Sequence, residues 1–133
     1  MSAVFADTYY YLALMNPRDS ANSRAVEFSA RWKRRIVTTT WVLVEVADAL
    51  AYPPQRPLFG LLMDALRSDR QTLVRPATES IFQRGVEFYE SRPDKAWSLT
   101  DCISFLTMTD HDLTDALTGD HHFEQAGYVA LLK

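Results

Sequence analysis

Short apolar runs alternate with helical segments along the whole sequence, and this alternation restricts the fold more than any other feature. The expected strands are residues 3–6, 36–39, 72–75, 115–118 and 128–132, and the expected helices are residues 9–15, 21–33, 41–50, 58–66, 79–89, 101–110 and 122–125. None of the strands is joined to the next by a two-residue hairpin turn. The pattern predicts an α/β fold: a three-layer α/β/α sandwich with a short, mainly parallel central sheet of four or five strands.

The size and composition are those of one globular domain, expected over residues 1–133. Cys102 is the single cysteine, which excludes an internal disulfide and suits a reducing cytosol. No apolar run has the length of a membrane span, and the start lacks the pattern of a signal peptide, so we expect a cytoplasmic protein without membrane contact. The net charge of −3 gives no general attraction to nucleic acid. A nucleic-acid enzyme on this chain needs local basic residues or metal ions to hold phosphates.

Four carboxylates stand at junctions between these elements. Asp7 follows the first strand, and Asp120 follows the fourth. Glu45 lies about a turn and a half into the helix after the second strand, and Asp101 lies in the first turn of its helix. Ligands of parallel α/β sheets gather at the carboxyl ends of the strands. We therefore expect the four acids to meet at one edge of the sheet.

Carboxylates brought together repel one another, and divalent cations relieve that repulsion. Oxygen ligands suit Mg²⁺ or Mn²⁺, which bind through a few carboxylates together with substrate phosphates. One or two such ions lower the pKa of a bound water and stabilise the oxygen that departs from phosphorus. The arrangement therefore predicts hydrolysis of phosphodiester bonds.

Helix capping is the alternative explanation for three of these acids, because Asp is common at helix starts. Taken singly, Asp7, Asp101 and Asp120 fit capping as well as catalysis. Glu45 does not, because it lies in the apolar helix start of residues 41–47, where an unpaired carboxylate is costly. At two of the helix starts we expect a threonine to be the cap, namely Thr40 and Thr100.

Four segments resemble the motifs of PIN domains, most closely the small VapC-like toxins of toxin–antitoxin pairs. They read VFADT at 4–8, TTWVLVEV at 39–46, SLTDCISF at 98–105 and ALTGDHHFEQAG at 116–127. The resemblance implies a metal-dependent ribonuclease whose catalytic and metal-binding residues are Asp7, Glu45, Asp101 and Asp120. It also implies an RNA substrate, a cognate antitoxin protein and a homodimer, for which apolar residues within 53–62 offer a surface. Thr8 matches the small hydroxyl residue that orients the first acid or a water on the metal.

Other residues have two interpretations each. Ser104 lies one turn after Asp101 and either supports the metal site or is a satisfied helix hydroxyl. Arg92 and Lys95 precede Asp101 and are candidates for contacts to RNA phosphates. The basic cluster within residues 31–35 precedes the second strand, so we expect it at the opposite edge of the sheet.

The neighbours of the acids are expected to be structural. His121 and His122 could suggest zinc, but no further His or Cys stands at ligand spacing, so we favour a structural role. Cys102 is expected in the core. A solvated face is expected for the acids Asp110, Asp112 and Asp115.

Two other functions fit the same residues. A related nuclease could process RNA or cleave DNA without a toxin role. A non-catalytic module for binding protein or RNA could use the acids only as caps or docking points.

Overall fold

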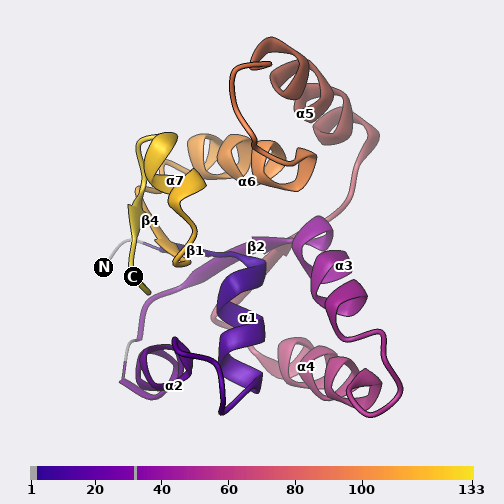
Figure 1. Cartoon of the computed structure of the whole chain (residues 1–133), viewed down its shortest axis with the longest axis vertical. Coiled ribbons are helices and arrows are strands. Elements are labelled where there is room, and N and C mark those ends of the chain that lie inside the picture. The colour runs from indigo at the N-terminus through magenta and orange to yellow at the C-terminus, as the bar shows by residue number, and fades with distance from the viewer. Residues whose placement is uncertain (1–2, 32) are drawn as a thin grey trace.

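The computed structural model describes residues 3–31 and 33–133 as five strands and seven helices. In chain order they are β1 (Val4–Ala6), α1 (Thr8–Met15), α2 (Asn22–Arg31), β2 (Ile36–Thr39), α3 (Thr40–Ala49), α4 (Arg56–Ser68), β3 (Thr72–Arg75), α5 (Glu79–Ser91), α6 (Leu99–Asp110), β4 (Asp115–Leu117), α7 (His121–Gln125) and β5 (Val129–Ala130) (Figure 1).

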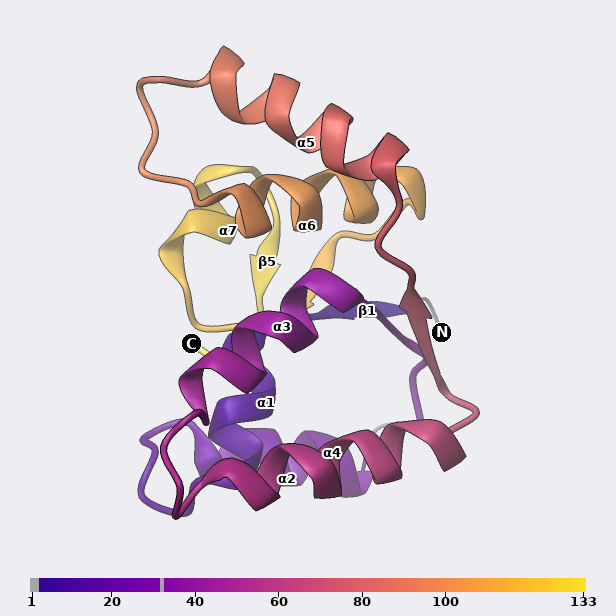
Figure 2. The same ribbon diagram turned by 90° about the vertical axis from the view of Figure 1, so that its right-hand side faces the viewer.

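The five strands form one parallel sheet in the order β3-β2-β1-β4-β5. Helices α1 to α4 lie on one side of the sheet and α5, α6 and α7 on the other, with α5 outside α6 (Figures 1 and 2). The predicted three-layer sandwich with a parallel sheet is confirmed. β1 is central, and its residues Val4, Phe5 and Ala6 are fully buried, which explains its uninterrupted apolar sequence.

Several element ends differ from the prediction. α2 ends at Arg31 rather than at residue 33, and Trp32, assigned to this helix from the sequence, lies outside the described residues. β5 covers only Val129–Ala130. At the start of α3, Thr39 is the cap and accepts a hydrogen bond from the Val42 amide.

Ser98, rather than Thr100, caps α6, and the prediction of both threonine caps is wrong for one physical reason. A cap residue keeps extended backbone angles while its side chain accepts an amide hydrogen bond. Thr39 (φ −131°, ψ 158°) and Ser98 (φ −70°, ψ 166°) meet that condition, whereas the predicted caps already belong to their helices.

An aromatic cluster holds the start of α6 in place. The ring of Phe105 contacts Trp97 and Phe123 edge-on, with centroids 5.1 and 5.0 Å apart. Trp97 comes just before α6 and Phe123 belongs to α7, so this cluster fixes both segments relative to the centre of the sheet. The segments that carry Asp101 and Asp120 are therefore packed against each other.

The opposite edge of the sheet carries the basic cluster, as predicted. Arg34, which is 8% exposed, bonds Asp115 at the first residue of β4 (2.9 Å). Asp110 pairs with Arg84 at 2.8 and 2.9 Å. These two acids therefore lie in ion pairs, and the prediction of a merely solvated face is wrong for them. Among the residues with described coordinates, no helix is both long enough and apolar enough to cross a membrane.

Two helix glycines provide a test of this packing. A Cβ at Gly85 would lie 2.5 Å from Cγ1 of Ile103, whereas a Cβ at Gly60 would meet nothing within 4 Å. We predict that Gly85→Ala lowers the free energy of unfolding by about 1–3 kcal/mol, because α5 must move away from α6. Gly60→Ala should raise it by about 0.5–1 kcal/mol, through helix propensity alone.

Urea unfolding of the two variants measures both effects. Equal stabilisation by both substitutions would contradict the close packing of α5 on α6.

Candidate active site

Asp7 lies between β1 and α1, and its carboxylate is almost fully buried (6% exposed). It stands at the N-cap position of α1, yet its side chain makes no capping hydrogen bond. Instead, the hydroxyl of Thr118 donates to Asp7 Oδ2 at 2.9 Å. Thr118 directly follows β4, the strand paired with β1, so the sheet itself sets this contact. Capping does not account for Asp7.

Burial raises the pKa of Asp7 from 3.8 to about 7. Hydrogen bonds from Thr118 and from the Thr8 amide oppose that rise, while the charges of Asp101 and Glu45 add to it. The carboxyl is therefore close to half-protonated at neutral pH, and its ionised form lacks compensating charge.

Glu45 reaches the same place from α3. Its carboxylate accepts a hydrogen bond from the hydroxyl of Thr8, the first residue of α1. Thr8 thus contacts the second acid through its side chain and the first acid through its amide. This bond joins α1 to α3 and holds Glu45 close enough to influence the pKa of Asp7.

Asp101 and Asp120 are linked through His122. Nδ1 of His122 lies 3.0 Å from Asp101 Oδ2 and 3.6 Å from Asp120 Oδ1. Asp101 Oδ2 also accepts the Ser98 amide in a capping box, and Asp120 accepts the His122 amide at the start of α7. Capping and clustering therefore coexist in these two acids.

The structure brings the four predicted acids together. The Thr118 hydroxyl completes the link, since it bonds Asp7 and also accepts the Asp120 amide at 3.1 Å. Among residues 3–31 and 33–133, no lysine or arginine forms an ion pair with any of the four acids. A set of carboxylate oxygens without basic partners has the charge and ligand type that Mg²⁺ or Mn²⁺ requires. The residues present therefore fit a divalent cation.

Ser104 strengthens this fit. Its hydroxyl is fully buried, one turn after Asp101, and has no hydrogen-bond partner among the residues described. The alternative of a satisfied helix hydroxyl is thus wrong, and such a group calls for an explanation. Cys102 is 1% exposed, and burial raises the pKa of its thiol, as suits a core residue.

Two residues of the cluster were not identified as site residues from the sequence. Thr118 was read only as part of a strand, although a polar residue ending an apolar strand is a usable signal. His122 was assigned a structural role, which its bridge between two acids extends. The ligand atoms of Asp120, His121 and His122 lie within 4.8 Å of one another, so imidazole donors also border the acids.

Arg92 and Lys95 lie in the loop before α6 and do not contact the acids. Arg92 makes two hydrogen bonds to Asp94, at 3.0 and 2.9 Å, and this pairing lowers the pKa of Asp94 to about 2. Both cations lie over the ring of Trp97, at 5.0 and 5.7 Å from its centre. They form a small basic surface near the start of α6.

Solved structures share this fold. VapC20 of Mycobacterium tuberculosis, a sarcin–ricin loop cleaving toxin, has 23% identity and a TM-score of 0.84, covering 96% of this chain and 97% of its own. VapBC2 of Rickettsia felis, solved bound to a promoter DNA fragment, has 11% identity and a TM-score of 0.67, covering 98% and 96%.

FitAcB of Neisseria gonorrhoeae has 17% identity and a TM-score of 0.62, covering 98% of this chain and 95% of its own. The chain has the PIN-like fold. No family model matches the sequence, and no curated protein matches it. The likeness therefore lies in the backbone of this PIN-like chain and in the placement of its acids.

The raised pKa of Asp7 predicts a pH-dependent stability for the metal-free protein. The folded state holds the proton more tightly than the unfolded chain, so stability should fall as pH rises from about 4 through about 7. Asp7→Asn should remove that fall and raise the free energy of unfolding at pH 8 by up to about 4 kcal/mol.

Denaturant unfolding in EDTA, repeated from pH 4 to pH 8, measures this difference. Asp48→Asn, at an exposed position of the same helix as Glu45, is the control and should follow the wild type. A wild-type curve that stays level across this range would contradict the burial of an ionisable Asp7.

Proposed function

We propose that this chain is an endoribonuclease that depends on Mg²⁺ or Mn²⁺ and acts as the toxin of a toxin–antitoxin pair. The observation that carries the proposal is the convergence of Asp7, Glu45, Asp101 and Asp120 without lysine or arginine partners among the described residues. VapC20, with the same fold, is a toxin that cleaves the sarcin–ricin loop, which supports a ribonuclease here.

The four acids would hold one or two cations. A bound cation activates water for attack on phosphorus and neutralises charge on the departing oxygen. Asp7 must lose its proton before it binds a cation, and the Thr118 hydroxyl steadies the resulting carboxylate. Thr8 orients Glu45, and the Ser98 amide orients Asp101.

His122 has a positioning role in this proposal. Its ring lies within 3.0 Å of Asp101, and its amide donates to Asp120 at 2.9 Å. The imidazole therefore sets the separation of these two acids. Ser104 supplies a buried hydroxyl one turn below Asp101.

A cognate antitoxin and a homodimer belong to the same proposal. VapBC2 and FitAcB share this fold, and VapBC2 was solved with promoter DNA, which supports a toxin–antitoxin setting. Apolar side chains of α3 and α4, including Leu43, Phe59 and Met63, line a groove that offers a subunit contact. An RNA-processing nuclease without an antitoxin differs in having no small antitoxin gene beside it.

The direct test is metal-dependent RNA cleavage by the purified protein, free of any antitoxin. Asp101→Asn should lower the cleavage rate at least about a hundredfold, because it removes one charge from the site. Asp110→Asn changes an acid at the far end of the same helix and should cleave as the wild type does. Cleavage mapping on total cellular RNA with Mg²⁺, Mn²⁺ or EDTA provides the measurement.

Two results would contradict the proposal. One is a wild type that cuts no RNA with either metal, which favours a binding module. The other is a cleavage rate that Asp101→Asn leaves unchanged.

The basic surface gives a separate prediction. Reversing both charges, with Arg92→Glu and Lys95→Glu, should weaken RNA binding while leaving metal binding intact. The slope of log affinity against log salt should fall by about 0.7 for each lost phosphate contact. A control pair at the opposite edge, Arg31→Glu with Arg35→Glu, should keep the wild-type slope. RNA affinity unaffected by reversal at Arg92 and Lys95 would show that the loop does not contact phosphates.

A further inference from the structure

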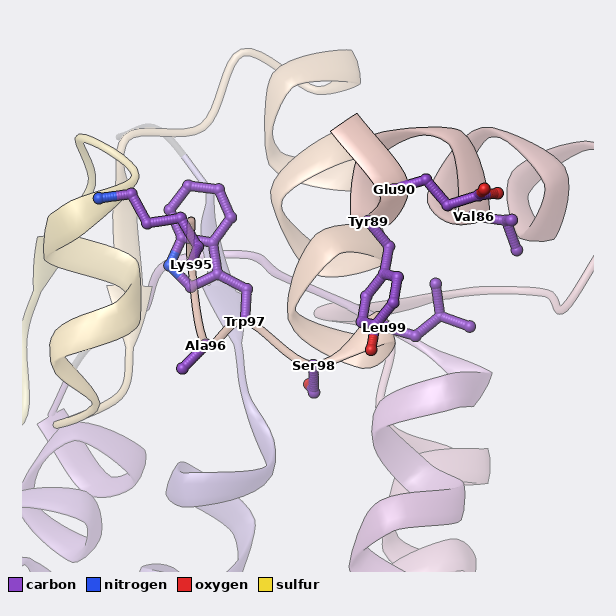
Figure 3. Close-up of a pocket in the computed structure, with 8 residues that line it drawn as sticks. All are labelled: Val86, Tyr89, Glu90, Lys95, Ala96, Trp97, Ser98 and Leu99. Carbon is purple, nitrogen blue, oxygen red and sulfur yellow. The ribbon is translucent and has the colours of Figure 1, made fainter. Parts of the chain in front are cut away.

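A cavity of about 700 Å³ lies beside the loop that joins α5 to α6. Its walls include Tyr89 and Glu90 of α5, Lys95 and Trp97 of the loop, and Ser98 and Leu99 at the start of α6. Figure 3 shows the ring of Tyr89 extending from α5 toward Ser98 and Leu99, with Lys95 lying over Trp97 on the other side. Helix, loop and helix start therefore border one space.

Ser98 connects this cavity to the four acids. Its hydroxyl accepts the Asp101 amide at 2.9 Å, and its own amide donates to Asp101 Oδ2 at 3.1 Å. A molecule in the cavity would touch a residue that is bonded directly to one of the acids. The position is that of a neighbouring nucleotide when a phosphate lies at the acids.

Tyr89 gives the cavity a free aromatic surface. Its side chain is 50% exposed and makes no hydrogen bond or ring contact within residues 3–31 and 33–133. Tyr10 and Tyr11, in contrast, are each 3% exposed. An exposed ring beside a proposed RNA site is a surface on which an unpaired base can stack, whatever its identity.

The charged groups around the cavity complement a nucleotide. Lys95 contributes an ammonium group near Trp97, suited to a phosphate. Glu90 is exposed and forms no ion pair with any described residue, so its carboxylate can accept a hydrogen bond from an amino or N–H group of a base. One side of the cavity thus suits the backbone of an RNA strand, and the other suits a base edge.

The wall that carries these groups is held before any ligand binds. Trp97 is 5% exposed, and its indole N–H donates to Gln125 Oε1 at 3.0 Å. The same ring packs edge-on against Phe88 and Phe105. A fixed wall reduces the ordering that binding requires.

From these observations we infer that the cavity binds one unpaired nucleobase of the RNA, stacked on Tyr89 and next to the phosphate held at the four acids. This inference rests on the proposed ribonuclease function and adds a base subsite to it. The subsite makes recognition depend on a single-stranded nucleotide beside the cut.

The test measures RNA binding separately from cleavage. Fluorescence anisotropy of a labelled single-stranded RNA in EDTA compares the wild type with Tyr89→Ala, Tyr89→Phe and Tyr52→Ala. Tyr52 is 76% exposed and lies after α3, so it is the matched control. Tyr89→Ala should weaken binding about tenfold or more, while the other two variants stay within about twofold of the wild type.

Cleavage of the same RNA with Mn²⁺ is measured in parallel, and Tyr89→Ala should raise KM. Tyr89→Phe keeps the ring, so retained binding by this variant shows that stacking, and not folding, accounts for the loss. RNA binding by Tyr89→Ala at wild-type strength would overturn the base subsite, even where the wild type cleaves. A change confined to self-association in sedimentation would overturn it too. Failure of the wild type to cleave would instead overturn the ribonuclease proposal.

Discussion

The hydrogen bond from Thr118 to Asp7 joins the two central strands at the edge where the acids meet. It depends on the parallel pairing of β1 with β4, which places the ends of both strands side by side. Burial within this pairing makes ionisation of Asp7 costly and raises its pKa to about 7. Helix α3 brings Glu45 to the same place, and α6 brings Asp101. The sheet therefore gathers like charges that a bound cation would balance.

Stability and function make opposite demands at this edge. A protein without a metal would be more stable with a neutral residue at Asp7, since stored repulsion lowers the free energy of unfolding. The fully buried, unpartnered hydroxyl of Ser104 is a second local cost. Such costs are expected where a site is prepared for a ligand, and the rest of the core offsets them. The rings around Phe105 and the Arg34–Asp115 pair provide that support away from the acids.

The sequence predicted the layers, the parallel sheet and the positions of the four acids, because each depends on local patterns. Apolar runs mark buried strands, and Asp7 and Asp120 follow two of them. The caps at Thr39 and Ser98 were missed by one and two residues, since backbone angles at helix starts are not visible in residue types. The bridge made by His122 and the bond from Thr118 depend on how α6, α7 and β4 pack, which no local pattern records. The roles of the acids stay predictions that the geometry supports.

Whether the four acids form one cation site is the central claim, and Mn²⁺ binding followed by electron paramagnetic resonance tests it most directly. The account predicts that Asp7→Asn, Glu45→Gln, Asp101→Asn and Asp120→Asn each weaken Mn²⁺ binding at least about tenfold. Asp48→Asn, an exposed change on α3, should bind as the wild type does. Wild-type affinity in both Asp7→Asn and Glu45→Gln would contradict a shared site.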